Sequence, residues 1–119
     1  MIITVTLNPS IDRTIRVENL VRGGVNRAEI IALDAGGKGV NVSRALTVYG
    51  APTHAIMIGA ALGSAWFHDV LTAARVPHTT VMAQGVTRSN ITLVEADGTV
   101  TKINEPGVTL NDSIIHDVE

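Results

Sequence analysis

The sequence predicts an α/β protein with a parallel core sheet and a second, smaller sheet that projects from it. Two short apolar runs, 2–7 and 55–58, are bounded by turn residues, as is typical of strands buried on both faces of a parallel sheet. Three other runs, 14–18, 90–95 and 99–102, alternate polar and apolar residues, which indicates a sheet with one face in water. Because alternating strands do not fit inside a parallel layer, we expect them to form a separate sheet.

Helical periodicity appears in the segments that separate these runs. A first helix is predicted over 38–49, ending before Gly50, and a second over 64–74, ending before Val76-Pro77. A third is expected to begin near Asn111, whose side chain can cap it. We expect the first helix to bury a stripe of apolar residues, namely Val42, Ala45, Leu46 and Tyr49.

Composition excludes several classes of function. Aromatic residues make up 3% of the 119 residues and the formal net charge is -2, so neither stacking platforms nor a basic field for nucleic acid is present. The absence of cysteine excludes disulfides and thiolate metal sites, and the histidine spacing predicts no metal site. The first residues lack the charged and apolar regions of a signal peptide. We therefore expect one cytoplasmic domain, with no nucleic-acid or membrane partner.

A glycine-rich turn, 35–41, lies between a predicted strand and the first helix. Its glycines Gly36 and Gly37 let backbone N–H groups approach a ligand, and a helix N-terminus favours an anion or hydroxyls. Lys38 is followed by glycine and not by the Ser or Thr of a P-loop, and the turn comes too late for a dinucleotide fingerprint. Asn41 offers donors and an acceptor to sugar hydroxyls. Taken alone, the turn is equally consistent with a strand-to-helix connection that needs glycine.

Other candidate ligand-binding residues lie after the first predicted strand and near the start of a later one. Asp12 comes after the first buried strand, where ligands of open α/β sheets bind, although an aspartate there can also bond its own backbone in a turn. Arg27, Arg88 and Lys38 are phosphate candidates, because cationic side chains bind phosphate oxygens; the alternative for each is a solvent-exposed charge. Asn90 is expected on the same strand face as Arg88.

A series of short motifs follows in order along the chain. It consists of Thr6-Leu7-Asn8-Pro9 with Asp12, the stretch 35–46, Gly50, Gly59-Ala60, Thr87-Arg88-Ser89-Asn90 and the stretch 102–107. Together these motifs resemble the PfkB carbohydrate kinases, a ribokinase-like family, and are most similar to its 1-phosphofructokinase and tagatose-6-phosphate kinase branch. The resemblance covers nearly the whole chain. The family's Gly-Ala-Gly-Asp motif, which supplies the anion hole and the catalytic base, is absent.

The resemblance implies the N-terminal portion of a kinase domain, with an incomplete ribokinase-like core. Lid strands at about 12–34 and 88–105 would be inserted in that core, and the lid would mediate a homodimer. Lys38 suits a phosphorylated sugar, because it replaces a neutral residue of kinases that act on uncharged sugars. The substrate-binding residues implied are Asp12, Gly36, Gly37, Lys38, Asn41 and Arg88, with Arg27 and Asn90 added by position.

The activity implied is transfer of a phosphoryl group from ATP, with Mg²⁺, to fructose 1-phosphate, giving fructose 1,6-bisphosphate. We expect the base and the main nucleotide-binding residues beyond residue 119, no catalytic residue within this chain, and no activity from the 119 residues alone. Tagatose 6-phosphate and fructose 6-phosphate are alternative substrates, although the stretch 104–107 favours fructose 1-phosphate. An alternative of another class is a non-catalytic module for sugar-phosphate binding or dimerisation.

Overall fold

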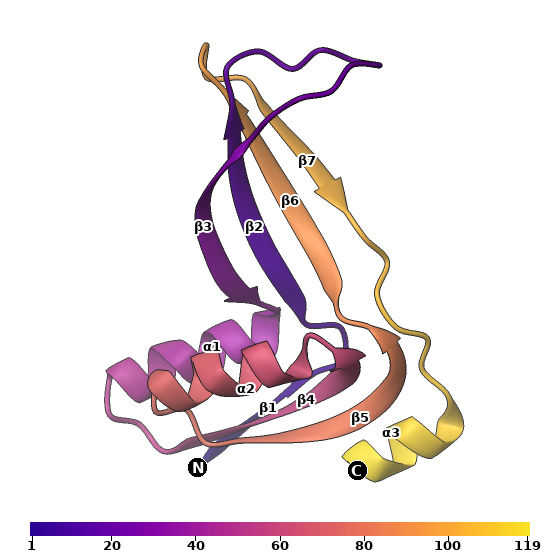
Figure 1. Cartoon of the computed structure of the whole chain (residues 1–119). Helices are drawn as coiled ribbons and strands as arrows, with labels where there is room; N and C mark the ends of the chain where they lie inside the picture. The colour runs from indigo at the N-terminus through magenta and orange to yellow at the C-terminus, as the bar shows by residue number, and fades with distance from the viewer.

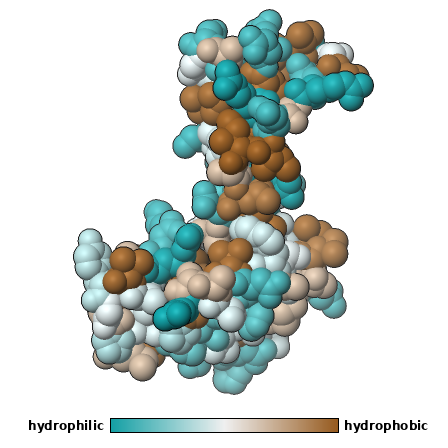
Figure 2. Space-filling model, turned by 60° about the vertical axis from the view of Figure 1, so that its left-hand side comes forward, coloured by the Kyte–Doolittle hydropathy of each residue, from teal (hydrophilic) through white to brown (hydrophobic).

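Two sheets and three helices make up the computed structural model, which describes residues 1–119. The core sheet is three-stranded and parallel, in the order β1 (Ile2–Thr6), β4 (Thr53–Leu62), β5 (His78–Val86). The second sheet is four-stranded, in the order β3 (Glu29–Gly36), β2 (Ser10–Val17), β6 (Arg88–Glu95), β7 (Val100–Asn104). The second sheet projects from the core as a separate layer (Figures 1 and 2), which confirms the predicted fold class.

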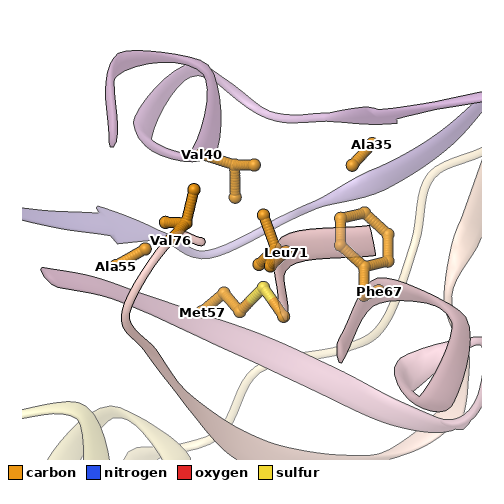
Figure 3. Packing of buried hydrophobic residues seen from close by; sticks show 7 residues of the cluster. All are labelled: Ala35, Val40, Ala55, Met57, Phe67, Leu71 and Val76. Carbon is orange, nitrogen blue, oxygen red and sulfur yellow. The ribbon is translucent and has the colours of Figure 1, made fainter. Parts of the chain in front are cut away.

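Helices α1 (Lys38–Val48) and α2 (Ser64–Ala73) lie together on one face of the core sheet (Figure 1). The apolar residues between helices and sheet form one cluster, shown in Figure 3: Ala35, Val40, Ala55, Met57, Phe67, Leu71 and Val76. Trp66 packs against this cluster and contacts Phe67 edge to face, with ring centroids 5.4 Å apart. Both aromatic residues therefore serve the core, as their helical position predicts.

The first strand is covered on one face only, so its predicted burial on both faces is wrong. Thr4 and Thr6 point toward the helices and are buried, whereas Ile3 is 60% and Val5 is 48% exposed. Strand β4, in the middle of the sheet, is buried along most of its length, as its apolar run predicts. The difference follows from position, because β1 is an edge strand and no helix lies over its outer face.

Helix α1 packs on the sheet through small and hydroxyl-bearing residues. Val40 and Ser43 are fully buried, whereas Val42 is 48% and Tyr49 is 87% exposed, so the predicted apolar stripe is wrong. The Ser43 hydroxyl lies 2.6 Å from Thr4 Oγ1 and 2.9 Å from Thr53 Oγ1. This hydrogen-bonded chain satisfies every hydroxyl and lets the helix approach β1 and β4 closely. Hydrophobicity alone does not identify such a face.

The predicted C-terminal helix is confirmed, and a tight turn joins β6 to β7. The Asn111 side chain accepts a hydrogen bond of 2.9 Å from the Ile114 N–H and caps α3 (Asp112–Val118). Gly98 has a φ of 90° in the turn between β6 and β7. The backbone N–H of Thr99, followed by its hydroxyl, lowers the pKa of Asp97 in the same turn. None of the three helices combines the length and the hydrophobicity needed to cross a membrane.

The second sheet starts at the carboxyl end of the core sheet. Strand β1 ends at Thr6 and β2 begins at Ser10, so a turn of a few residues joins the two sheets. Strand β2 pairs in parallel with β6 and antiparallel with β3. Alternation along β2 gives this sheet a polar face, which carries Ser10, Asp12 and Thr14, and a mainly apolar face, which carries Ile11, Arg13 and Ile15.

Replacing Ser43 tests the hydroxyl chain beneath α1. Ser43→Ala leaves the buried Thr4 hydroxyl without its side-chain partner, so the free energy of unfolding should fall by about 1–3 kcal/mol. Val48→Ala, on the exposed side of the same helix, is the control and should change it by about 0.5 kcal/mol or less. Urea unfolding measures both variants, and equal losses would contradict the role of the chain.

Candidate functional site

A row of polar residues crosses all four strands of the second sheet. Asp12 on β2 is in register with Asp34 on β3 and, on its other side, with Asn90 on β6. Asn90 is in turn in register with Asn104 on β7. Residues in register point to the same face of a sheet, so these four side chains form one row, which we call the polar row.

The next row toward the core combines a glycine, a serine and an arginine. Ser10 is in register with Gly36 on one side and with Arg88 on the other. The Ser10 hydroxyl lies 2.6 Å from Asp12 Oδ1 and donates a hydrogen bond to it. A Cβ atom at Gly36 would collide with the Asp12 carboxylate and with the Ser10 hydroxyl. Glycine is therefore required at position 36 because the side chains of β2 occupy that space.

The polar row has more acceptors than donors. Asp12 and Asp34 carry like charges on adjacent strands, an arrangement that destabilises a sheet unless another group relieves it. Asn90 Oδ1 is buried and has no hydrogen-bond partner, and it is the only side-chain atom of the structure in that state. A ligand that donates several hydrogen bonds, such as a polyol, would satisfy these oxygens.

The glycine-rich turn leads from this site into α1. Gly37 has a φ of 130° and no side chain caps the helix N-terminus. The N–H of Val40 donates to Thr6 Oγ1 at 2.9 Å, while Lys38 and Asn41 are exposed and make no side-chain hydrogen bond. The free backbone donors and the Lys38 ammonium favour an anion at this end of the helix.

Arg88 is fixed at one point of its guanidinium and free at the others. Its Nε donates a hydrogen bond of 3.1 Å to the backbone carbonyl of Asn8, and the side chain is half-buried. A hollow of about 240 Å³ lies beside it, lined by Val86, Arg88, Glu105, Pro106 and Gly107. The terminal nitrogens of the guanidinium remain available for a bidentate contact with an anion.

The structure brings together most, but not all, of the predicted site residues. Asp12, Asn90, Gly36 and Arg88 occupy two neighbouring rows of one face, and Gly37, Lys38 and Asn41 follow directly on the turn and helix. Arg27 lies apart from them, in the exposed loop beyond the far ends of β2 and β3. The four residue steps of β2 from Asp12 to Arg16 span roughly 13 Å, and Arg27 lies beyond that end.

Sequence reasoning missed Ser10, Asp34 and Asn104 as members of these rows. Asp34 is separated from Asp12 by a long loop, and the strand 29–36 has no clear polar alternation. The signal that finds these residues is strand register, which places Asp34 and Asn104 in the row once the pairs of Asp12 and Asn90 are known. Register depends on tertiary pairing and is not visible in a single strand.

The chain does not provide a metal-binding set. No group of three or more His, Asp or Glu side chains lies close enough together to hold a metal ion. Magnesium needs six ligands, so the two carboxylates of the polar row cannot bind it alone. A magnesium ion bound to one or two carboxylates takes its other ligands from water and phosphate. No residue of this chain is therefore assigned to magnesium.

Curated relatives of the chain are bacterial sugar-phosphate kinases. It is 40% identical over 119 residues to a 1-phosphofructokinase of Xanthomonas campestris pv. campestris, covering 98% of the chain and 37% of the relative. It is 33% identical to a 1-phosphofructokinase of Vibrio cholerae, covering 99% of the chain and 37% of the relative. The chain thus spans a little over a third of the length of these relatives. No protein-family model matches it.

Solved structures with the same fold are phosphofructokinases. A putative phosphofructokinase from Staphylococcus aureus superposes with a TM-score of 0.91 at 31% identity, covering 99% of this chain and 38% of the other. Phosphofructokinase-2 from Escherichia coli, solved in complex with fructose-6-phosphate, gives 0.87 at 30% identity, covering 98% and 39%. The projecting sheet is therefore a feature of these kinases too. Over nearly its whole length the chain is thus similar to part of the 1-phosphofructokinases, and its structural neighbours are ribokinase-like carbohydrate kinases of the phosphofructokinase-2 type.

Proposed function

We propose that the chain is the substrate-binding part of an ATP-dependent kinase that phosphorylates a ketose phosphate. The substrate that we favour is fructose 1-phosphate, which the reaction would convert to fructose 1,6-bisphosphate. The observation that carries the proposal is the polar row, where the buried Asn90 Oδ1 lacks a donor and two carboxylates lie on adjacent strands, with Arg88 and Lys38 close along the chain. The names of the relatives support the same activity.

The polar row suits the hydroxyl groups of a sugar. Asp12, already oriented by Ser10, would accept a hydrogen bond from one sugar hydroxyl on its free oxygen. Asn90 Oδ1 would accept a hydrogen bond from another hydroxyl. Asp34 would gain a donor as well, which would relieve its repulsion from Asp12. Hydrogen bonds to charged acceptors contribute about 1.5–3 kcal/mol each, enough to orient a small ligand.

The phosphate of the substrate would lie between Arg88 and the N-terminus of α1. Arg88 keeps its terminal nitrogens free, and Lys38 and the free N–H groups of the turn add positive charge. In this arrangement the phosphate fixes one end of the ketose while the polar row fixes its hydroxyls. Phosphoryl transfer depends mainly on such positioning.

The rest of the chemistry would come from groups outside these residues. ATP and Mg²⁺ supply the transferred phosphoryl group and neutralise its charge when bound. The second sheet would act as a lid over the sugar, with its polar face inward, and would exclude water, a competing acceptor. An enzyme that uses ATP and a sugar phosphate would work in the cytoplasm, and this location is part of the proposal.

One alternative to this proposal is another ketose-phosphate substrate, and a second is a non-catalytic function. Fructose 6-phosphate or tagatose 6-phosphate would present similar hydroxyls and a phosphate, and fructose-6-phosphate is bound by the related phosphofructokinase-2. Initial rates of the complete kinase with the three ketose phosphates would rank them, with fructose 1-phosphate expected first. A non-catalytic sugar-phosphate or dimerisation module would instead bind sugar phosphate with the same heat whether or not nucleotide is present.

The apolar face of the second sheet supports a homodimer formed through the lid. Its exposed side chains include Leu33 and Ile103, which share a row with Ile91 and with Arg13, the one charged member of that row, and Ile30, in register with Ile15. Figure 2 shows apolar side chains gathered on the projecting sheet. Exposed apolar patches of this kind mark protein interfaces, and a second copy of the sheet would cover the patch.

Arg88→Ala tests the phosphate-binding role. In the complete kinase the substitution should lower kcat/KM for fructose 1-phosphate more than about tenfold, because a charged contact with the phosphate is lost. Arg75→Ala removes the same charge in the turn after α2, at the other end of that helix from the site, and should change kcat/KM less than about twofold. Unchanged kinetics for Arg88→Ala would remove this residue from the site.

Leu33→Lys tests the interface on the lid. A charge on the apolar face should weaken the dimer and shift sedimentation toward the monomer, because an unpaired lysine would be buried between the copies. Glu29→Lys, on the same strand but exposed outside the apolar rows, is the control. A wild-type protein that sediments as a monomer at micromolar concentration would contradict the dimer.

A further inference from the structure

The stretch that follows β7 is hydrogen-bonded to Ser89, the residue next to Arg88. Glu105 accepts a hydrogen bond on its carboxylate from the N–H of Ser89, and its own N–H donates to the Ser89 carbonyl at 3.2 Å. These two bonds continue the β6–β7 ladder past its regular end. The backbone that carries Arg88 is therefore held by residue 105.

The same stretch also holds the turn that receives the Arg88 side chain. Asn8 Nδ2 donates a hydrogen bond of 3.0 Å to the carbonyl of Pro106. Gly107, with a φ of 92°, lies so close to Asn8 that an added Cβ would collide with Asn8 Oδ1. The Asn8 carbonyl is the group that accepts the hydrogen bond from Arg88 Nε. Residues 105–107 thus contact both the donor strand and the acceptor turn of that bond.

We propose that residues 105–107, together with the Asn8 side chain, are a positioning device for Arg88. The inference rests on the proposed function, in which Arg88 binds the substrate phosphate. The hydrogen bond from Nε fixes the orientation of the planar guanidinium. Its two terminal nitrogens therefore point in one direction before the substrate binds. A preorganised arginine loses less conformational freedom on binding, which favours affinity.

Residues 105–107 do not belong to the hydrophobic core or to the polar row. Asn104 belongs to the polar row, whereas Glu105, Pro106 and Gly107 line the hollow beside Arg88 and contact Ser89 and Asn8. The three residues are exposed or half-buried, so packing of a core does not require them. Their contacts are directed at the groups that orient one cationic side chain.

Two glycines of the chain provide a matched pair of substitutions. Gly107 and Gly98 have φ values of 92° and 90°, so alanine imposes the same backbone strain at either position. A Cβ at Gly107 would collide with Asn8, whereas a Cβ at Gly98 would meet nothing within 4 Å. Any difference between Gly107→Ala and Gly98→Ala therefore reports the contact with Asn8.

In the complete kinase, Gly107→Ala should raise the KM for fructose 1-phosphate about fivefold, with kcat changed less than about twofold. Gly98→Ala should leave both constants unchanged. Asn8→Asp keeps the size of the side chain but removes the N–H donor to Pro106, and should raise KM in the same way. A merely structural role would reduce the active fraction, which lowers the apparent kcat and leaves KM unchanged.

Combining each substitution with Arg88→Ala separates this inference from the proposed function. If residues 105–107 act through Arg88, Gly107→Ala should raise KM less than about twofold in the Arg88→Ala background. A normal KM for Gly107→Ala and for Asn8→Asp, with a raised KM for Arg88→Ala, would overturn the positioning role alone. A normal KM for Arg88→Ala would instead overturn the role of Arg88 in the proposed site.

Discussion

The parallel pairing of β2 with β6 is the constraint on which the rest of the site depends. It joins segments about eighty positions apart in the chain and sets Asp12 beside Asn90 and Ser10 beside Arg88. A shift of one residue would turn one of these strands over and send its polar side chains to the apolar face. The neighbouring β2–β3 register is restricted as well, because a Cβ atom at Gly36 would collide with Asp12 and Ser10.

The site keeps features that are unfavourable for the folded chain by itself. Paired carboxylates on adjacent strands and a buried amide oxygen without a partner each reduce stability. Local violations of this kind are expected where function, and not folding, has determined the residues. The buried hydroxyl chain of Thr4, Ser43 and Thr53 is the opposite case, since every member is satisfied and its role is to hold α1 on the sheet.

Much of the fold was predictable from sequence, because turn and cap signals are local. Strands β1 and β4, helices α1 and α2 and the Asn111 cap lie where their patterns place them. Which faces are covered was not predictable: Ile3 and Tyr49 are apolar in sequence and exposed in the structure. Motifs identified Asp12 and Arg88, but Asp34 joins them only through register, and Arg27 lies apart from them at the far end of the second sheet.

A crystal structure of the complete kinase with fructose 1-phosphate bound tests the central claim most directly. The account predicts ketose hydroxyls within about 3.2 Å of Asp12 and of Asn90 Oδ1, and the phosphate against the guanidinium of Arg88. A sugar phosphate bound elsewhere, with Asn90 Oδ1 still unpaired and Arg88 pointing into solvent, would contradict it.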